Sequence, residues 1–186
     1  MRSLRGQSSK MPGGCGLSRV EPRWSASYNR HVAGFETRLI LKDENATAGL
    51  GGRIAAGLKP GDVVALSGEL GAGKTALARA ILRARGVEGH VPSPTFTLVQ
   101  AYETPGLTVH HFDLYRIDDE TELRELGLED ARDEGAVLIE WPERGMPKDW
   151  EGDVLNVSLH VANETAREAL ISGPMRWRPV FEGTSP

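Results

Sequence analysis

One eight-residue segment limits the possible folds of this chain more than any other, and it reads Gly68-Glu69-Leu70-Gly71-Ala72-Gly73-Lys74-Thr75. It matches the pattern G-x-x-x-x-G-K-[ST], in which a glycine-rich loop joins a strand to a helix. Both neighbours are present, because the apolar run 63–67 predicts a buried parallel strand and residues 75–85 predict a helix. The segment therefore predicts an α/β fold built around a phosphate-binding loop, or P-loop.

The residue types of this loop suit a nucleoside triphosphate. Phosphate oxygens must approach backbone N–H groups closely, and glycines permit that approach, while the N-terminus of the following helix favours negative charge. Lys74 is expected to reach the β- and γ-phosphates as a catalytic residue, and Thr75 to offer its hydroxyl to Mg²⁺. The predicted nucleotide-binding residues of the loop are Gly68, Leu70, Gly71, Ala72, Gly73, Lys74 and Thr75.

Two further predicted strands end in an acid that could lie beside the metal. The apolar run 136–139 leads into Glu140 and is closed by Pro142, as expected of a buried strand with a carboxylate at its rim. The run 107–112 leads into Asp113. Both acids are candidate catalytic residues. Either carboxylate could orient the attacking water, and the sequence leaves both assignments open.

The remaining elements complete a mostly parallel central sheet with helices on both faces and an antiparallel hairpin. Spacing and turn residues predict strands at 35–41, 96–102, 153–160 and 168–172, a helix at 44–58 capped by Asp43, and an amphipathic helical region at 118–134. His110 and His111 are adjacent and therefore point to opposite faces of a strand, so we interpret them as structural. Trp141 is expected to be a core aromatic residue.

Composition divides the chain into two parts. Residues 1–34 hold six Lys or Arg against one acid and are rich in Ser, Gly and Pro, which predicts a basic, disordered N-terminal extension. An early start codon or an organelle transit peptide would also explain them. Residues 35–186 form the predicted P-loop ATPase domain, and they are more acidic than the chain's net charge of −4 indicates. A broad nucleic-acid surface on that domain is therefore not expected.

The chain carries no sign of a membrane segment or of a disulfide framework. Its longest purely apolar stretches, such as 63–66, are far shorter than the roughly 20 residues that span a bilayer. The single cysteine, Cys15, has no partner for an internal disulfide. We therefore expect a cytoplasmic protein without membrane partners.

Five motifs taken together resemble the TsaE (YjeE) family, the bacterial ATPases of tRNA threonylcarbamoyladenosine biosynthesis. Their order and spacing match that family from about Phe35 to about Gly173. The motifs are Asp43-Glu44-Asn45-Ala46-Thr47, Gly68 to Thr75, Ser93-Pro94-Thr95-Phe96, His111-Phe112-Asp113-Leu114-Tyr115-Arg116 and Ile139-Glu140-Trp141-Pro142. Their joint occurrence is far more specific than the P-loop alone.

The resemblance implies a P-loop ATPase that binds ATP and Mg²⁺ and resets the TsaB–TsaD complex between turnovers, with tRNA contacted only through that complex. It implies that Thr75 and Glu140 hold the metal and that Asp113 lies close to the reacting phosphate. Thr95 would supply a switch-like hydroxyl, and Glu44 and Thr47 would contact the nucleotide. The ATPase of such proteins is weak in isolation.

Three other functions share parts of this pattern. A small-molecule kinase would need an arginine-bearing lid, and the arginines after Glu140 are not clustered. A GTP switch protein would be expected to carry an Asn-Lys-x-Asp motif, which the sequence lacks. A nucleotide-gated adaptor that does not hydrolyse ATP would use the same residues as a weak ATPase.

Overall fold

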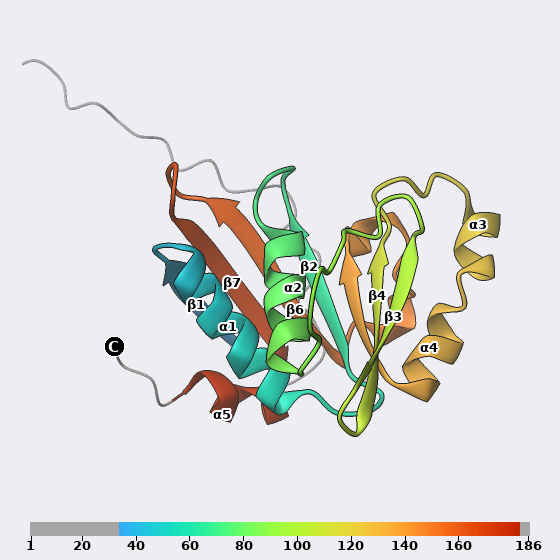
Figure 1. The fold of residues 1–186 in the computed structure, drawn as a ribbon, viewed down its shortest axis with the longest axis horizontal. Coiled ribbons are helices and arrows are strands. Elements are labelled where there is room, and N and C mark those ends of the chain that lie inside the picture. The colour runs from blue at the N-terminus through green and yellow to red at the C-terminus, as the bar shows by residue number, and fades with distance from the viewer. Residues whose placement is uncertain (1–33, 183–186) are drawn as a thin grey trace, which may run out of the picture. The chain divides into compact units, whose positions relative to one another are not determined.

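The computed structural model describes residues 34–182 and arranges them around a seven-stranded sheet (Figure 1). The strands are β1 (Gly34–Leu41), β2 (Val63–Gly68), β3 (Val99–Thr104), β4 (Leu107–Asp113), β5 (Ala136–Glu140), β6 (Val154–Val161) and β7 (Arg167–Pro174). Their order across the sheet is β1-β7-β6-β2-β5-β4-β3. The predicted extension, residues 1–34, lies outside the described residues apart from Gly34, so its prediction stays a prediction.

The four central strands β6, β2, β5 and β4 run parallel to one another. β3 pairs antiparallel with β4, which confirms the predicted hairpin, and β7 pairs antiparallel with both β6 and β1. A mostly parallel core with antiparallel additions at both edges is the predicted class of fold. Because β2, β4 and β5 are parallel, their carboxyl ends meet at one edge of the sheet.

Helices cover both faces of the sheet, so the architecture has three layers. The helices are α1 (Glu44–Gly57), α2 (Lys74–Ala84), α3 (Glu120–Glu125), α4 (Leu128–Glu134) and α5 (Arg178–Phe181), with 3₁₀ turns at Pro142–Arg144, Lys148–Trp150 and Met175–Trp177. Within residues 34–182, every helix is too short or too polar to cross a membrane.

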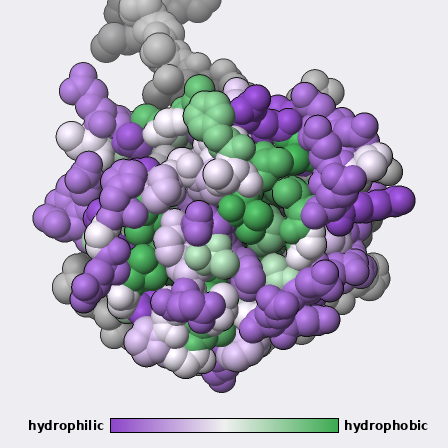
Figure 2. Space-filling model, turned by 45° about the vertical axis from the view of Figure 1, so that its right-hand side comes forward, coloured by the Kyte–Doolittle hydropathy of each residue, from purple (hydrophilic) through white to green (hydrophobic). Residues whose placement is uncertain are grey.

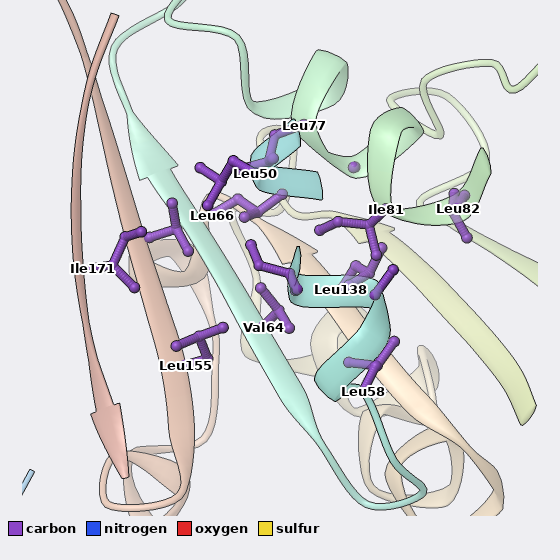
Figure 3. Close-up of a cluster of buried hydrophobic side chains, with 14 of the residues drawn as sticks. Leu50, Leu58, Val64, Leu66, Leu77, Ile81, Leu82, Leu138, Leu155 and Ile171 are labelled. Carbon is purple, nitrogen blue, oxygen red and sulfur yellow. The ribbon is translucent and has the colours of Figure 1, made fainter. Parts of the chain in front are cut away.

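Successive side chains of the central strands point to opposite faces of the sheet, and this divides the core into two clusters. In β2, Val64 and Leu66 pack under α1 and α2 together with Leu138 of β5 (Figure 3), whereas Val63 and Ala65 face α4 and Trp150. This is the period of two that places successive strand side chains on opposite faces. On the face drawn in Figure 2, hydrophobic side chains gather in patches bordered by hydrophilic ones.

The glycine-rich helix α1 has a packing reason for one of its glycines. A Cβ on Gly51 would lie 2.5 Å from the Cβ of Ala80 and 2.8 Å from its carbonyl carbon, so α1 and α2 approach each other closely at this point. Positions 49 and 52 face open space, and no contact there requires glycine. Asp43 caps the helix as predicted, because its Oδ1 accepts a hydrogen bond of 2.8 Å from the backbone N–H of Ala46.

Two predicted elements differ from those observed. The strand predicted at 96–102 begins only at Val99, because residues 94–98 form a turn closed by the Leu98 N–H on the carbonyl of Pro94 at 2.6 Å. Leu98 itself has a φ of 63°. The helical region predicted at 118–134 is two helices, since Gly127 adopts a φ of 65° between α3 and α4.

Candidate nucleotide-binding site

A cavity of about 310 Å³ lies at the edge where β2, β4 and β5 end. It is lined by Leu70, Gly71, Gly73, Lys74, Thr75, Ala76, Ser93, Thr95, Asp113, Tyr115, Glu140 and Trp141. The P-loop, the loop before β3 and the ends of two strands all contribute to it. The ends of β4 and β5 are in register, with Asp113 opposite Glu140, so the two predicted acids come from neighbouring positions.

The P-loop owes its shape to glycines at positive φ. Gly71 has a φ of 79° and Gly73 a φ of 106°, and a Cβ at either position would meet no atom of the described residues within 4 Å. Gly68 has a φ of 132°, and a Cβ there would collide with the carbonyl oxygen of Leu159 in β6. Gly68 is thus required by the neighbouring strand as well as by the turn.

Lys74 is buried beneath the loop, with 4% of its surface exposed. Its Nζ donates hydrogen bonds to the carbonyl oxygens of Gly68 at 2.7 Å and Glu69 at 2.9 Å. An ammonium has three N–H donors, so one is left for a phosphate. Burial lowers the pKa of Lys74 below its ordinary value, and neighbouring carboxylates, Glu140 foremost, oppose that shift.

The Lys74 ammonium also lies over the aromatic ring of Trp141. Trp141 directly follows β5 and has a φ of 60°, and its ring centroid lies 3.7 Å from Nζ. The ring also packs against Tyr115, with 4.9 Å between the ring centroids. Trp141 packs against the core, as expected of it, and also forms part of the wall of the site. The positive φ that turns it there is not visible in the sequence.

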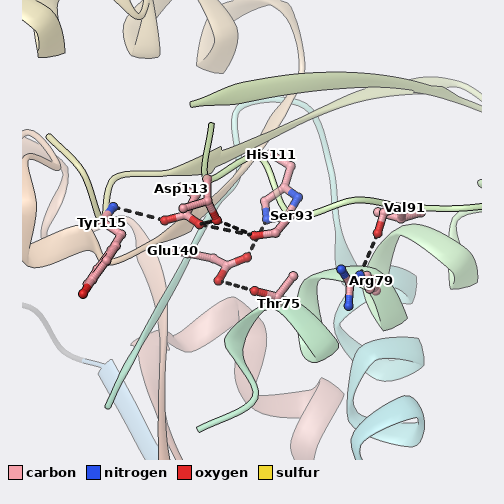
Figure 4. Close-up of polar contacts among 9 residues, drawn as sticks. Thr75, Arg79, Val91, Ser93, His111, Asp113, Tyr115 and Glu140 are labelled. Atoms are coloured by element: carbon pink, nitrogen blue, oxygen red, sulfur yellow. Dashed lines mark hydrogen bonds and ion pairs between the residues drawn. The ribbon is translucent and has the colours of Figure 1, made fainter. Parts of the chain in front are cut away.

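Thr75 and Glu140, the two residues predicted to hold the metal, are in direct contact (Figure 4). The Thr75 hydroxyl donates to Oε2 of Glu140 at 2.7 Å. The other carboxylate oxygen, Oε1, lies 2.9 Å from Nε2 of His111 in β4. Glu140 is 2% exposed and His111 is fully buried. The sequence predicts a structural role for His111, and the structure places it in direct contact with Glu140 of the candidate site.

Asp113 is held by the loop that precedes β3 (Figure 4). Its Oδ2 accepts hydrogen bonds from the hydroxyls of Thr95 at 2.7 Å and Ser93 at 3.3 Å, and its Oδ1 accepts one from the backbone N–H of Tyr115 at 3.1 Å. The two hydroxyls also lie 2.9 Å apart. Ser93 and Tyr115 lie within two of the five motifs that resemble the family, and their hydrogen bonds to Asp113 assign them to the site.

The remaining predicted residues take different places. Leu70 lies on the rim of the cavity with 77% of its surface exposed, whereas the Ala72 side chain is fully buried in the core, so only its backbone could face a phosphate. Glu44 and Thr47 lie in the first turn of α1, and neither lines the cavity. Their predicted contact with the nucleotide stays a prediction.

The oxygen ligands offered by Thr75 of α2 and Glu140 at the end of β5 fit the predicted metal. Thr75 offers a hydroxyl oxygen and Glu140 a carboxylate oxygen 2.7 Å from it, and hard oxygen donors of this kind suit Mg²⁺. Mg²⁺ in phosphate-binding sites usually takes one or two protein oxygens and completes its shell with phosphate and water. Thr75 and Glu140 are the residues that would hold it.

Comparisons with known proteins identify the family of this chain. The family model described as "Threonylcarbamoyl adenosine biosynthesis protein TsaE" matches residues 41–169. A Rickettsia felis protein named "tRNA threonylcarbamoyladenosine biosynthesis protein TsaE" is 45% identical over 106 residues, which cover 56% of this chain and 62% of that protein. A Nostoc protein of the same name is 36% identical over 141 residues, covering 73% of this chain and 85% of that protein.

A solved structure has a similar fold. The crystal structure of Bacillus subtilis YdiB superposes with a TM-score of 0.64 and 26% sequence identity, over 83% of this chain and 95% of that one. The matched span 41–169 includes the P-loop, both predicted acids and the loop that holds Asp113. On the match of its family model and on these relatives, the chain belongs to the TsaE family.

Proposed function

We propose that this chain is the Mg²⁺-dependent ATPase of the tRNA threonylcarbamoyladenosine machinery, and that it resets a TsaB–TsaD complex between turnovers. The observation that carries the proposal is the meeting of Lys74, Thr75, Asp113 and Glu140 around one cavity at the end of a parallel sheet. Membership of the TsaE family supplies the pathway, because the relatives are named for it. Contact with tRNA is proposed to run only through the partner proteins.

The site divides the work of phosphoryl transfer among its residues. The loop N–H groups and the free donor of Lys74 bind the phosphates, and Thr75 with Glu140 holds the metal. When bound, Mg²⁺ neutralises the charge that builds on the phosphates. Asp113 accepts a hydrogen bond from the attacking water and aims this water in line with the bond that breaks.

Slow turnover of the isolated protein would follow from the state of Asp113. Its Oδ2 accepts hydrogen bonds from hydroxyls of the loop before β3, so a water at Oδ2 would have to compete with that loop. Among the described residues that line the cavity there is no arginine. An arginine that stabilises the transition state would therefore come from elsewhere. A partner that shifts the Thr95 loop, or adds such a group, would raise the rate.

The reaction of the complete machinery tests the proposal. We would measure threonylcarbamoylation of tRNA by TsaB–TsaD at a constant supply of the activated donor, with no addition, with this protein, and with its Glu140→Gln variant. The expected result is that the wild type alone carries the reaction past one turnover. A wild type that splits ATP and leaves the modification at one turnover would contradict the partner assignment.

A nucleotide-gated adaptor would use the same residues without splitting ATP. Release of inorganic phosphate during the same reaction separates the two functions. Phosphate released in step with modified tRNA supports an ATPase, whereas repeated turnover without phosphate release supports an adaptor.

A further inference from the structure

His111 is a fully buried polar residue that the proposed chemistry does not yet use. It lies on β4 two residues before Asp113, so both side chains point to the same face of the sheet, toward α2. There its Nε2 lies 2.9 Å from Oε1 of Glu140 (Figure 4). Its neighbour His110 faces the opposite side, where Nε2 is 3.9 Å from a carboxylate oxygen of Glu134 in α4.

The contact has a defined direction. An ionised carboxylate only accepts hydrogen bonds, so Nε2 of His111 carries the proton and donates it to Oε1. The other ring nitrogen, Nδ1, is buried and has no hydrogen-bond partner among the described residues.

This hydrogen bond orients the carboxylate whose other oxygen would hold the metal. The Thr75 hydroxyl has a single proton and gives it to Oε2, so His111 is the side chain that holds Oε1. With Oε1 anchored, the carboxylate plane cannot rotate, and Oε2 stays beside the Thr75 hydroxyl. Glu140 is 2% exposed, so water could not readily take the place of the His111 N–H if that side chain were removed.

We propose that His111 is a positioning residue that orients the Glu140 carboxylate for Mg²⁺, and thereby sets how strongly Mg²⁺ tightens nucleotide binding. The proposal rests on the function proposed above, since it assumes that Thr75 and Glu140 hold the metal. Partners that orient metal-binding side chains typically contribute about 10–100-fold in metal affinity or activity.

The test is the affinity for ADP, measured by isothermal titration calorimetry with and without Mg²⁺, for variants at position 111. His111→Gln can place an amide donor near the position of Nε2, whereas His111→Asn places one nearer to Nδ1 and His111→Leu removes the donor. The ratio of the two dissociation constants is the readout. His110→Leu is the matched control, because its side chain faces away from the site.

We expect the Mg²⁺ effect to fall about 10–100-fold in His111→Leu and His111→Asn, and to stay within about threefold of wild type in His111→Gln and His110→Leu. Affinity for ADP without Mg²⁺ should be unchanged in all four, since Lys74 and the loop are intact. An equal loss with and without Mg²⁺ in His111→Leu would mean a merely structural role and would overturn the proposal, as would an unchanged ratio.

Two further outcomes are decisive. If His111→Leu fails to fold, as shown by urea denaturation, the comparison of Gln with Asn decides, and equal ratios for these two variants overturn the proposal. If wild-type protein binds ADP equally well with and without Mg²⁺, the proposed metal site fails, and that result is distinct from failure of the role of His111.

Discussion

Three glycines of α1 give a sharp test of the packing between α1 and α2. Replacing glycine by alanine is expected to stabilise the protein at positions 49 and 52 and to destabilise it at position 51. At Gly49 and Gly52 an added Cβ meets open space. At Gly51 it would lie 2.5 Å from the Cβ of Ala80, 2.8 Å from its carbonyl carbon and 3.0 Å from the backbone nitrogen of Ile81.

The expected magnitudes come from two opposing contributions. Alanine in place of glycine stabilises a helix interior by about 0.5–1 kcal/mol, because it reduces the freedom of the unfolded chain. Gly49→Ala and Gly52→Ala should therefore each stabilise the protein by that amount. Overpacking costs about 1–3 kcal/mol, and at Gly51 the obstacle is backbone and a short side chain that cannot rotate away. Gly51→Ala should thus destabilise the protein by about 0.5–2 kcal/mol.

Equilibrium urea denaturation followed by circular dichroism measures these differences. For a chain of this size each kcal/mol corresponds to about 2–4 °C in Tm, so thermal unfolding gives an independent value. We expect Gly51→Ala to unfold before the wild type and the other two variants to unfold after it. A Gly51→Ala protein as stable as Gly49→Ala would refute the close approach of α1 and α2.

Four further predictions follow from single features. Asp43→Ala should cost about 1 kcal/mol of unfolding free energy through loss of the N-cap bond to Ala46, again by urea denaturation. Leu138→Ala, in the middle of β5 and fully buried, should cost about 2–5 kcal/mol in the same assay. Lys74→Met should weaken ADP binding at least about 10-fold in calorimetry. The urea midpoint of Lys74→Met should stay at or above that of wild type. Burial disfavours the charged ammonium of Lys74 and thereby lowers its pKa, and methionine carries no charge. Deleting residues 1–33 should leave ADP affinity unchanged. A truncated protein unable to bind ADP would show that the N-terminal extension is required for nucleotide binding.

The local pattern of the sequence is sufficient for the central elements of the fold. The strand β2, the P-loop and α2 follow from one motif, and the apolar runs that end in Asp113 and Glu140 predict β4 and β5 with their acids at the correct edge. These predictions succeed because each depends on neighbours in the chain. Parallel strands then bring the two acids together.

The features that the sequence could not predict depend on contacts between distant segments or on unusual backbone conformations. The left-handed φ of Leu98 delays β3, and that of Trp141 turns a ring onto Lys74. The bond between His111 and Glu140 depends on the register of β4 against β5, which no local pattern specifies. For the same reason, only the structure separates Gly51 from the other glycines of α1.

The most direct test of the central claim is steady-state release of phosphate from ATP by the full chain, with Mg²⁺, in the absence and presence of TsaB–TsaD. We predict slow release by the isolated protein and a clear increase when the partners are added, because the Thr95 hydroxyl competes with the attacking water for the Asp113 carboxylate. Hydrolysis that is absent in both conditions, or that does not change when the partners are added, would contradict it.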